Sequence, residues 1–150
     1  MKELGFVVKT ADIGDAGVLS ALAIRMWEDS DPDELTEEFR ESIQNEDSAC
    51  FLKYIEGKPV AFAQCKLRHD YVEGTDNSPV GYLEGIFVTE GHRRKGCAAE
   101  LLAECERWAK EKGCSEFASD CELDNIDSQR FHTAMGFQET NRIICFKKEL

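Results

Sequence analysis

Several features that would define a protein class are scarce in this 150-residue sequence. It contains 3 prolines and 11 glycines without a repeating period, which excludes collagen-like and low-complexity chains. No apolar run approaches the roughly 20 residues of a membrane-spanning helix, so no membrane partner is expected. Hydrophobic residues nevertheless make up 42% of the chain, which is enough for a buried core. The sequence therefore predicts a single domain over residues 1–150.

Disulfide signatures are absent as well. The seven cysteines are odd in number, contain no CxxC pair and mostly lie in apolar patterns, as free thiols packed in a core do. Residues 1–10 have no long apolar core, so no signal peptide is expected. Both observations favour a reducing cytoplasm.

Basic residues are outnumbered. The chain has 18 Lys and Arg against 30 Asp and Glu, for a formal net charge of −12. Because a nucleic-acid-binding protein presents a basic face, nucleic acid is not an expected partner. Ten of the carboxylates lie in residues 28–47 beside a single cation, Arg40. This stretch is either a solvated helix face or a source of attraction for a cationic small molecule.

Hydrophobic periodicity predicts alternating helices and strands in one α+β domain with a mixed sheet. Strands are expected at residues 6–8, 50–55, 59–67, 81–88, 117–119 and 143–146. Helices are expected at residues 15–27, 35–44, 96–112 and 127–135, with Pro32 and residues 71–79 in loops. Gly113 and Gly136 are expected to end helices.

Three consecutive cations, Arg93, Arg94 and Lys95, directly precede the helix that opens at Gly96. A helix N-terminus carries unpaired N–H groups and a partial positive charge. The small residues that follow allow a phosphate to approach the backbone closely. This segment therefore predicts an anion site suited to a pyrophosphate.

The same segment resembles the signature of the GNAT family of acyl-CoA N-acetyltransferases. Arg93, Gly96 and Ala98 match the pattern Arg/Gln-x-x-Gly-x-Gly/Ala. A second family motif, Asn-x5-Leu-x4-Gly-Phe, is matched by Asn125, Phe131, Gly136 and Phe137, with Phe in place of Leu. The resemblance implies a mixed, mostly antiparallel sheet, splayed at the strand over residues 81–88 and flanked by helices. It also implies acetyl-CoA as the co-substrate.

The resemblance assigns cofactor contacts to three parts of the chain. The strand backbone at Ile86, Phe87 and Val88 would pair with the pantetheine arm as an added strand does. The pyrophosphate would bind backbone amides of Arg94, Lys95, Gly96, Cys97, Ala98 and Ala99. Asn125 would bond the pantetheine or its neighbour.

Longer strings are similar to bacterial aminoglycoside 6'-N-acetyltransferases. They are Tyr-Val-Glu-Gly-Thr at 71–75, Ser-Pro-Val-Gly-Tyr-Leu-Glu-Gly-Ile at 78–86, Glu-Phe-Ala-Ser-Asp at 116–120 and Gly-Phe-Gln-Glu-Thr at 136–140. This resemblance implies direct acetyl transfer to the 6'-amine of the antibiotic in a ternary complex, and so resistance. It implies substrate contacts at Trp27, Tyr71, Glu84 and Asp120, while Asn141 stands where relatives have an acidic contact. It also implies a homodimer, with the helix at 15–27 or the last strand as candidate interface.

The chemistry of these residues suits an aminoglycoside, which is a polycation. Glu84 and Asp120 can pair with ammonium groups, and either can accept the proton that the attacking amine loses. Tyr71 and Trp27 offer aromatic faces to sugar rings and cations, although Trp27 also suits a core position. His132 lies where many GNAT enzymes place a tyrosine acid. It is either the proton donor to the leaving thiolate or a bystander.

Other chemistries are less well supported. Acidic residues at 120, 122, 124 and 127 lack the glycine and glutamate that an EF-hand loop requires, so no metal is expected. The family resemblance implies direct transfer, and nothing in the sequence besides the helix end would lower a thiol pKa, so Cys97 and Cys121 are not expected to be nucleophiles. Two alternative functions stay open: acetylation of another polycation, such as a polyamine or a lysine side chain, and a non-catalytic acetyl-CoA-binding module.

Overall fold

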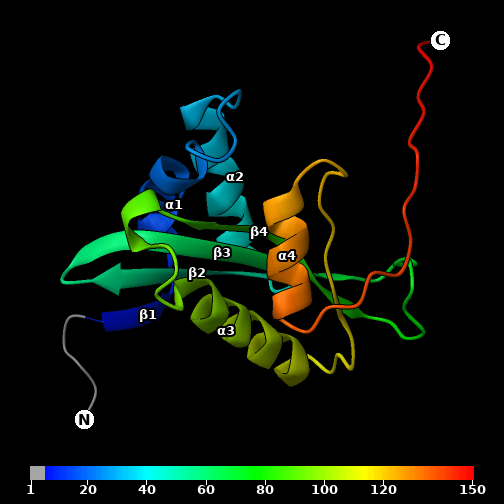
Figure 1. Ribbon diagram of the computed structural model, residues 1–150. Helices are drawn as coiled ribbons and strands as arrows, with labels where there is room; N and C mark the ends of the chain where they lie inside the picture. Colours follow the sequence, from blue (N-terminus) through cyan, green and yellow to red (C-terminus); the bar gives the residue numbers. More distant parts are fainter. Residues whose placement is uncertain (1–5) are drawn as a thin grey trace.

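A five-stranded sheet forms the centre of the computed structural model, which describes residues 6–150 (Figure 1). Its strands lie side by side in chain order: β1 (Phe6–Thr10), β2 (Ser48–Ile55), β3 (Lys58–Arg68), β4 (Val80–Val88) and β5 (Phe117–Ala118). The pairs from β1 to β4 are antiparallel, whereas β5 runs parallel to β4. Half of the segment used to exclude a signal peptide, residues 1–5, lies outside the described residues.

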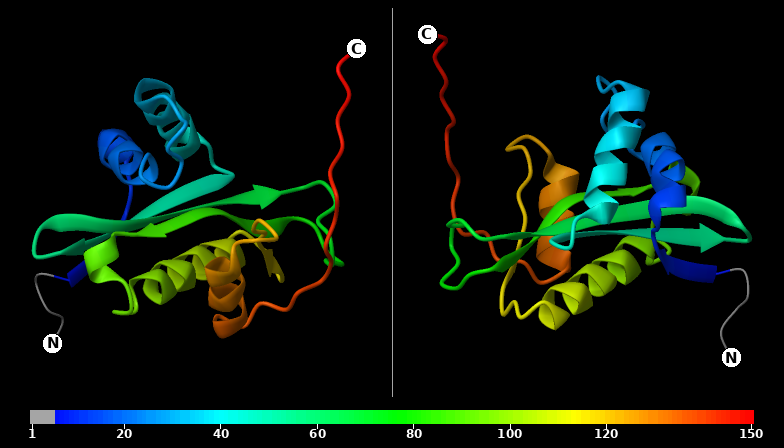
Figure 2. Two further views of the ribbon diagram at one scale, coloured as in Figure 1. Left: turned by 45° about the horizontal axis from the view of Figure 1, so that its top comes forward. Right: turned by 180° about the vertical axis from the view of Figure 1, so that it is seen from behind.

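Helices cover both faces of the sheet. α1 (Ala16–Ala23) and α2 (Pro32–Gln44) lie on one face, and α3 (Cys97–Glu111) and α4 (Ile126–Ala134) on the other (Figure 2). Short 3-10 helices, η1 (Ile13–Asp15) and η2 (Glu90–His92), precede α1 and α3. The predicted α+β class with a mixed, mostly antiparallel sheet is confirmed.

Alternating side chains of β3 serve the two faces. Phe62 is fully buried with Leu19 of α1 and Phe39 of α2, and its ring meets the Phe39 ring edge-on with centroids 5.8 Å apart. Ala61 and Ala63 face the opposite side and pack with Leu101, Leu102 and Cys105 of α3. The period of two in β3 thus divides the core into two layers.

The first two helices differ at their ends from the sequence prediction. α2 begins at Pro32, not at residue 35, because the Asp31 carboxylate accepts the backbone N–H of Glu34 at 3.0 Å. Proline suits the first helical position, since its missing N–H would have no helical partner there. The expected helix over residues 15–27 is shorter, because regular α-helix ends at Ala23 and turns lead to Trp27.

The strand predicted at residues 143–146 does not form. Residues 138–150 are exposed, contain no regular secondary structure and extend away from the body (Figure 1). Ile143, Ile144 and Phe146 are 70%, 80% and 90% exposed. A strand requires a hydrogen-bonded neighbour, and the described strands leave none beside these residues. The prediction of a last strand is therefore wrong for the described part of the chain, residues 6–150.

All seven cysteines are free thiols, and five of them are buried. The expectation that most of them pack in the core is confirmed, and Cys121 and Cys145 are the two exposed ones. Among residues 6–150, no helix is both long and apolar enough to cross a bilayer.

Candidate active site

The N-terminus of α3 forms an open anion cradle. Gly96 is its N-cap, with a left-handed φ of 81° and no side-chain cap, and the helical ladder starts with Glu100 N–H donating to the Gly96 carbonyl at 3.0 Å. The N–H groups of the preceding turn have no helical acceptor. They are available to an anion, and the helix dipole favours one at this position.

The three cations of the loop are exposed around this cradle. Arg93 turns back, so that its Nε donates to the Val88 carbonyl at 3.0 Å and joins the loop to the end of β4. Arg94 has a φ of 63° and, with Lys95, leads directly to Gly96. The segment predicted to hold a pyrophosphate therefore has the required shape and charge.

An ion pair fixes the same helix end to the sheet. Lys53 of β2 has only 4% of its surface exposed, and its Nζ lies 2.7 Å from Oε2 of Glu100, in the first turn of α3. The Glu100 side chain is 46% exposed, so the lysine is the buried partner of this pair. The cradle is thus held in place before any ligand arrives.

Cys97, the first residue of α3, is a packing residue. Its side chain is buried, and its thiol lies 3.8 Å from the His92 carbonyl. Burial raises the pKa of this thiol despite the nearby Lys53. Since only a thiolate is an effective nucleophile, this shift disfavours covalent chemistry at Cys97.

β4 is paired on both edges only over its first half. β5 pairs with Gly81 and Tyr82 and then ends, while β3 pairs with β4 as far as Val88. Ile86, Phe87 and Val88 therefore keep one open backbone edge, and all three are half-buried. This is the splay that the family resemblance implied.

A β-bulge lies in the middle of β4. Gln64 pairs with Gly85 and Cys65 with Leu83, so Glu84 is the extra residue. A Cβ on Gly85 would lie 2.9 Å from the Trp27 ring, which places the indole directly over the bulge. Trp27 is half-buried and meets Phe62 edge-on with centroids 6.3 Å apart. It is both a core residue and a wall of the site.

An open hollow of about 540 Å³ lies beside the end of β4 on the α1 face. Its lining residues come from the end of α1 and from the β4–α3 loop: Ile24, Arg25, Glu28, Phe87, Glu90 and Arg93. The Arg25 guanidinium lies 5.5 Å from the centre of the Phe87 ring. The hollow has the size of a small-molecule site and adjoins the anion cradle through Arg93.

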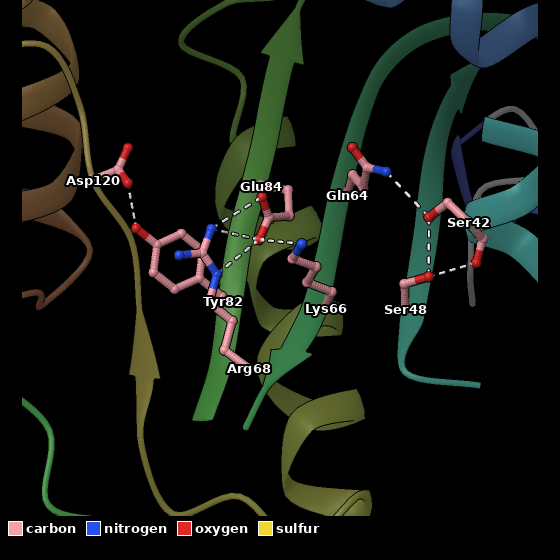
Figure 3. Close-up of polar contacts among 8 residues, drawn as sticks. All are labelled: Ser42, Ser48, Gln64, Lys66, Arg68, Tyr82, Glu84 and Asp120. Atoms are coloured by element: carbon pink, nitrogen blue, oxygen red, sulfur yellow. Dashed lines mark hydrogen bonds and ion pairs between the residues drawn. The ribbon is translucent and has the colours of Figure 1, made fainter. Parts of the chain in front are cut away.

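The two predicted acidic residues belong to one chain of polar contacts (Figure 3). The Tyr82 hydroxyl donates to the Asp120 carboxylate, and the Arg68 guanidinium lies 3.4 Å from the centre of the Tyr82 ring. Arg68 in turn binds both carboxylate oxygens of Glu84, and Lys66 lies 3.9 Å from one of them. Burial, together with Asp120, raises the pKa of Tyr82, so its hydroxyl stays a donor.

Tyr71 lies in the loop between β3 and β4 and is 75% exposed. The far end of this loop is fixed to β5, because the Glu116 carboxylate accepts the backbone N–H groups of Asp76 and Asn77 at 3.0 and 2.9 Å. These bonds lower the pKa of Glu116, the one from Asp76 most. The anchor leaves the Tyr71 end of the loop exposed to solvent.

His132 of α4 is bound on both ring nitrogens. Nδ1 lies 2.7 Å from the Ser128 carbonyl, and Nε2 lies 2.7 Å from the hydroxyl of Ser119, the first residue after β5. Because a carbonyl can only accept, Nδ1 carries the proton donated to Ser128. Phe131 and Phe137 pack against the ring with centroids 5.5 and 5.0 Å away. The geometry connects the imidazole to the point where β4 and β5 separate.

Two predicted contacts have other partners. The side-chain oxygen of Asn125 accepts the Ser128 N–H at 3.1 Å and caps α4, so it positions that helix. Asn141, in the extended C-terminal segment, donates to Glu73 at 2.9 Å. Its amide joins this segment to the Tyr71 loop.

Sequence reasoning missed four polar residues of the site: Lys66, Arg68, Tyr82 and Ser119. Lys66 and Arg68 had a detectable signal, because cations two apart in a strand lie on one face and β3 pairs with β4. Tyr82 had a similar signal, because it lies two residues before Glu84 in the same strand and therefore on the same face of the sheet. Ser119 had none, since its role depends on where α4 lies. Among residues 6–150, no group of three or more His, Cys, Asp and Glu side chains is arranged to hold a metal.

Comparison with known proteins agrees with this geometry. A model of the Acetyltransferase (GNAT) family matches residues 18–137. An aminoglycoside N(6')-acetyltransferase type 1 from Serratia marcescens is 44% identical over 131 residues, covering 87% of this chain and 90% of the relative.

Two solved structures are similar over nearly the whole chain. AAC(6')-Iy in complex with the bisubstrate analogue CoA-S-monomethyl-acetylneamine has a TM-score of 0.92 at 36% identity, covering 97% of this chain and 99% of that one. AAC(6')-Ih from Acinetobacter baumannii has a TM-score of 0.91 at 37% identity, with the same coverage.

The chain belongs to the acetyltransferase (GNAT) family. Within that family its relatives are aminoglycoside N(6')-acetyltransferases, and the predicted fold and family resemblance are confirmed.

Replacing Gly96 with valine tests the anion cradle. A side chain at a φ of 81° is strained, and its methyl groups would enter the open space beside the first turn of α3. We expect the KM for acetyl-CoA to rise about tenfold or more, equivalent to roughly 1.4 kcal/mol, with little change in the KM for the acceptor. Gly91→Val, in the same loop with open space around it, is the control. Equal acetyl-CoA KM values for the two variants would contradict the cradle.

Proposed function

We propose that this protein transfers the acetyl group of acetyl-CoA to the 6'-amino group of aminoglycoside antibiotics. One observation carries the proposal: Glu84 at the β4 bulge and Asp120 after β5 lie in one chain of contacts beside a strand edge that leads to an anion cradle. The first feature suits a cationic acceptor and the second a pyrophosphate. The relatives described above support the choice of acceptor.

The proposed cofactor site follows β4 toward α3. The open edge at Ile86, Phe87 and Val88 would pair with the amide-bearing pantetheine arm as an added strand. The cradle amides, from Arg94 to Ala99, would hold the pyrophosphate. When bound, acetyl-CoA supplies a thioester at the splay between β4 and β5. Asn125 would act indirectly, by capping the helix that carries His132.

The proposed acceptor site lies on the α1 face of the same bulge. Glu84 and Asp120 would bind ammonium groups of the antibiotic, and Trp27 and Tyr71 would contact its sugar rings. Asn141 would contribute a neutral contact from the C-terminal segment. The 6'-nitrogen attacks the thioester carbonyl as a free amine, a new C–N bond forms and the C–S bond breaks. Glu84 or Asp120, directly or through water, accepts the proton that the nitrogen loses.

Acetylation removes one positive charge from the antibiotic. Because cations provide much of the affinity for a nucleic-acid backbone, the product would bind ribosomal RNA more weakly. Resistance is the expected consequence in a cell that expresses the protein.

Acceptor preference tests the proposal directly. Purified protein with acetyl-CoA should release free thiol with tobramycin, and mass spectrometry should place one acetyl group on the 6'-nitrogen. An aminoglycoside with a hydroxyl group at 6' is the matched control and should give no 6'-acetylated product. Faster thiol release with spermidine or a lysine peptide than with tobramycin would favour another polycation as substrate, and no release with any amine would favour a binding module.

His132 is assigned a role in protonating the leaving sulfur. Its Nε2 is bonded to Ser119, so the proton would pass to the sulfur from the Ser119 hydroxyl and be replaced from the imidazole. This direction requires the imidazole to be protonated and Ser119 to accept its Nε2–H. The serine is the group at the strand separation, and the histidine acts through it.

The variant His132→Asn tests this assignment. An asparagine amide can still donate to the Ser128 carbonyl but cannot supply the proton, so we expect kcat to fall by on the order of a hundredfold with the acetyl-CoA KM nearly unchanged. Thr133→Ala, on the exposed side of the same helix, is the control. Should kcat stay at the wild-type value, the histidine would serve only to hold α4 against β5.

We also propose that two copies associate through the C-terminal segment. Ile143, Ile144 and Phe146 are large apolar side chains that lie exposed to water close together in the sequence. Burying each of them against a second copy would contribute about 1.5–3 kcal/mol to association. The match to AAC(6')-Iy covers 97% of the chain, which is too much for residues 138–150 to be left out.

Light scattering would measure this association. We expect wild-type protein at twice the 16.9-kDa chain mass, and the double variant Ile144→Lys/Phe146→Lys at the chain mass, because two charges oppose burial of the segment. Leu123→Lys, at another exposed apolar residue, should remain dimeric. A monomeric wild-type protein would contradict the proposal.

We further propose the cytoplasm as the working location. Five buried free thiols are compatible with a reducing compartment. Cell fractionation would test this location.

A further inference from the structure

Arg68 occupies the place that a substrate cation would take on Glu84. Its Nη2 lies 3.1 and 3.4 Å from the two carboxylate oxygens, and its Nε lies 3.3 Å from one of them (Figure 3). The guanidinium also stacks on Tyr82, whose hydroxyl binds Asp120. Arg68 and Tyr82 together thus link the two carboxylates expected to bind ammonium groups, and the cation on Glu84 belongs to the protein.

The local charge differs from what two carboxylates would suggest. Glu84 and Asp120 contribute two negative charges, while Arg68 and Lys66 contribute two positive charges within contact distance of Glu84. The face is therefore close to neutral. An incoming ammonium group gains little attraction unless it displaces Arg68 from Glu84.

Arg68 is well placed to be displaced. It is the last residue of β3, directly before the loop that carries Tyr71, and its side chain is 38% exposed. Glu84 is partly exposed as well, with 22% of its side chain accessible. Because water reaches both side chains, it can solvate each charge when the ion pair opens. The long side chain can then extend into solvent without disturbing the strand.

We propose that Arg68 is an internal competitor for the acceptor cation and thereby makes the site selective for amines with several positive charges. This inference rests on the proposed function. A substrate with one ammonium group exchanges one cation for another at Glu84 and gains little. An aminoglycoside contacts Glu84 and Asp120 with different ammonium groups of one molecule, so the second contact adds to the first without a new association cost.

The variant Arg68→Met tests the competition. Methionine keeps an apolar stem of similar reach over Tyr82 but leaves Glu84 without its guanidinium. We expect kcat/KM for 6-amino-6-deoxyglucose, a sugar with a single amine, to rise about tenfold, as for the loss of a competing charge-assisted pair. The value for tobramycin should change less than about threefold, so the ratio between the two acceptors falls.

Three further variants make the result specific. Arg107→Met, on the exposed side of α3, changes the net charge equally and should leave the ratio unchanged. In a Glu84→Gln background the effect of Arg68→Met should disappear, because the carboxylate for which the cations compete is gone. Arg68→Lys keeps the charge but not the two-pronged contact, and should give an intermediate ratio even if the methionine variant folds poorly.

The outcomes separate this inference from the proposed function. If wild-type protein acetylates tobramycin but Arg68→Met raises KM for both acceptors, Arg68 positions Glu84 and the inference is wrong. An unchanged acceptor ratio in the methionine and lysine variants also overturns it. If wild-type protein does not acetylate tobramycin, the proposed function fails and this inference fails with it.

Discussion

The geometry of the site depends on the loss of pairing along β4. A parallel neighbour two residues long leaves the second half of β4 with an unsatisfied edge, and the bulge at Glu84 lies where this open half begins. In a folded protein such an edge is normally covered, because unpaired backbone groups are costly away from water. Here the edge points from the bulge toward the N-terminus of α3. The open backbone and the anion cradle therefore form one continuous surface.

The side chains proposed to bind the acceptor and those proposed to protonate the leaving sulfur lie on opposite faces of the sheet, at the gap between β4 and β5. Carboxylates, aromatic rings and the cations that bind them lie on the face of α1 and α2, while Ser119 and His132 face α4 on the other side. The strand alternation that separates Ser119 from Asp120 is the reason: consecutive residues after β5 point in opposite directions. An acceptor and a leaving group can consequently be handled from opposite sides of one strand gap.

Most of the architecture could be predicted from the sequence, because the signals for strands, turns and helix ends are local. The alternation in β3 and β4, the small residues after Gly96 and the proline and glycine positions each reflect one strand, turn or helix end. The polar contacts of the site were less predictable. Glu84 was identified as an acid, but its pairing with Arg68 depends on the register between β3 and β4, which the bulge shifts by one residue. The prediction of a strand at 143–146 was wrong for a related reason, because an apolar sequence pattern does not specify which strand the segment would pair with.

The bonds between Glu116 and the backbone of residues 76 and 77 have a consequence for how the acceptor site could diversify. They fasten one half of the β3–β4 loop to the residue that precedes β5, while in the other half Val72 is buried and the Tyr71 side chain is exposed. Insertions or substitutions near Tyr71 would therefore leave the positions of β4 and β5 intact. Changes in the Tyr71 half of the β3–β4 loop could therefore adapt the site to acceptors of other shapes while β4 and β5 keep their positions.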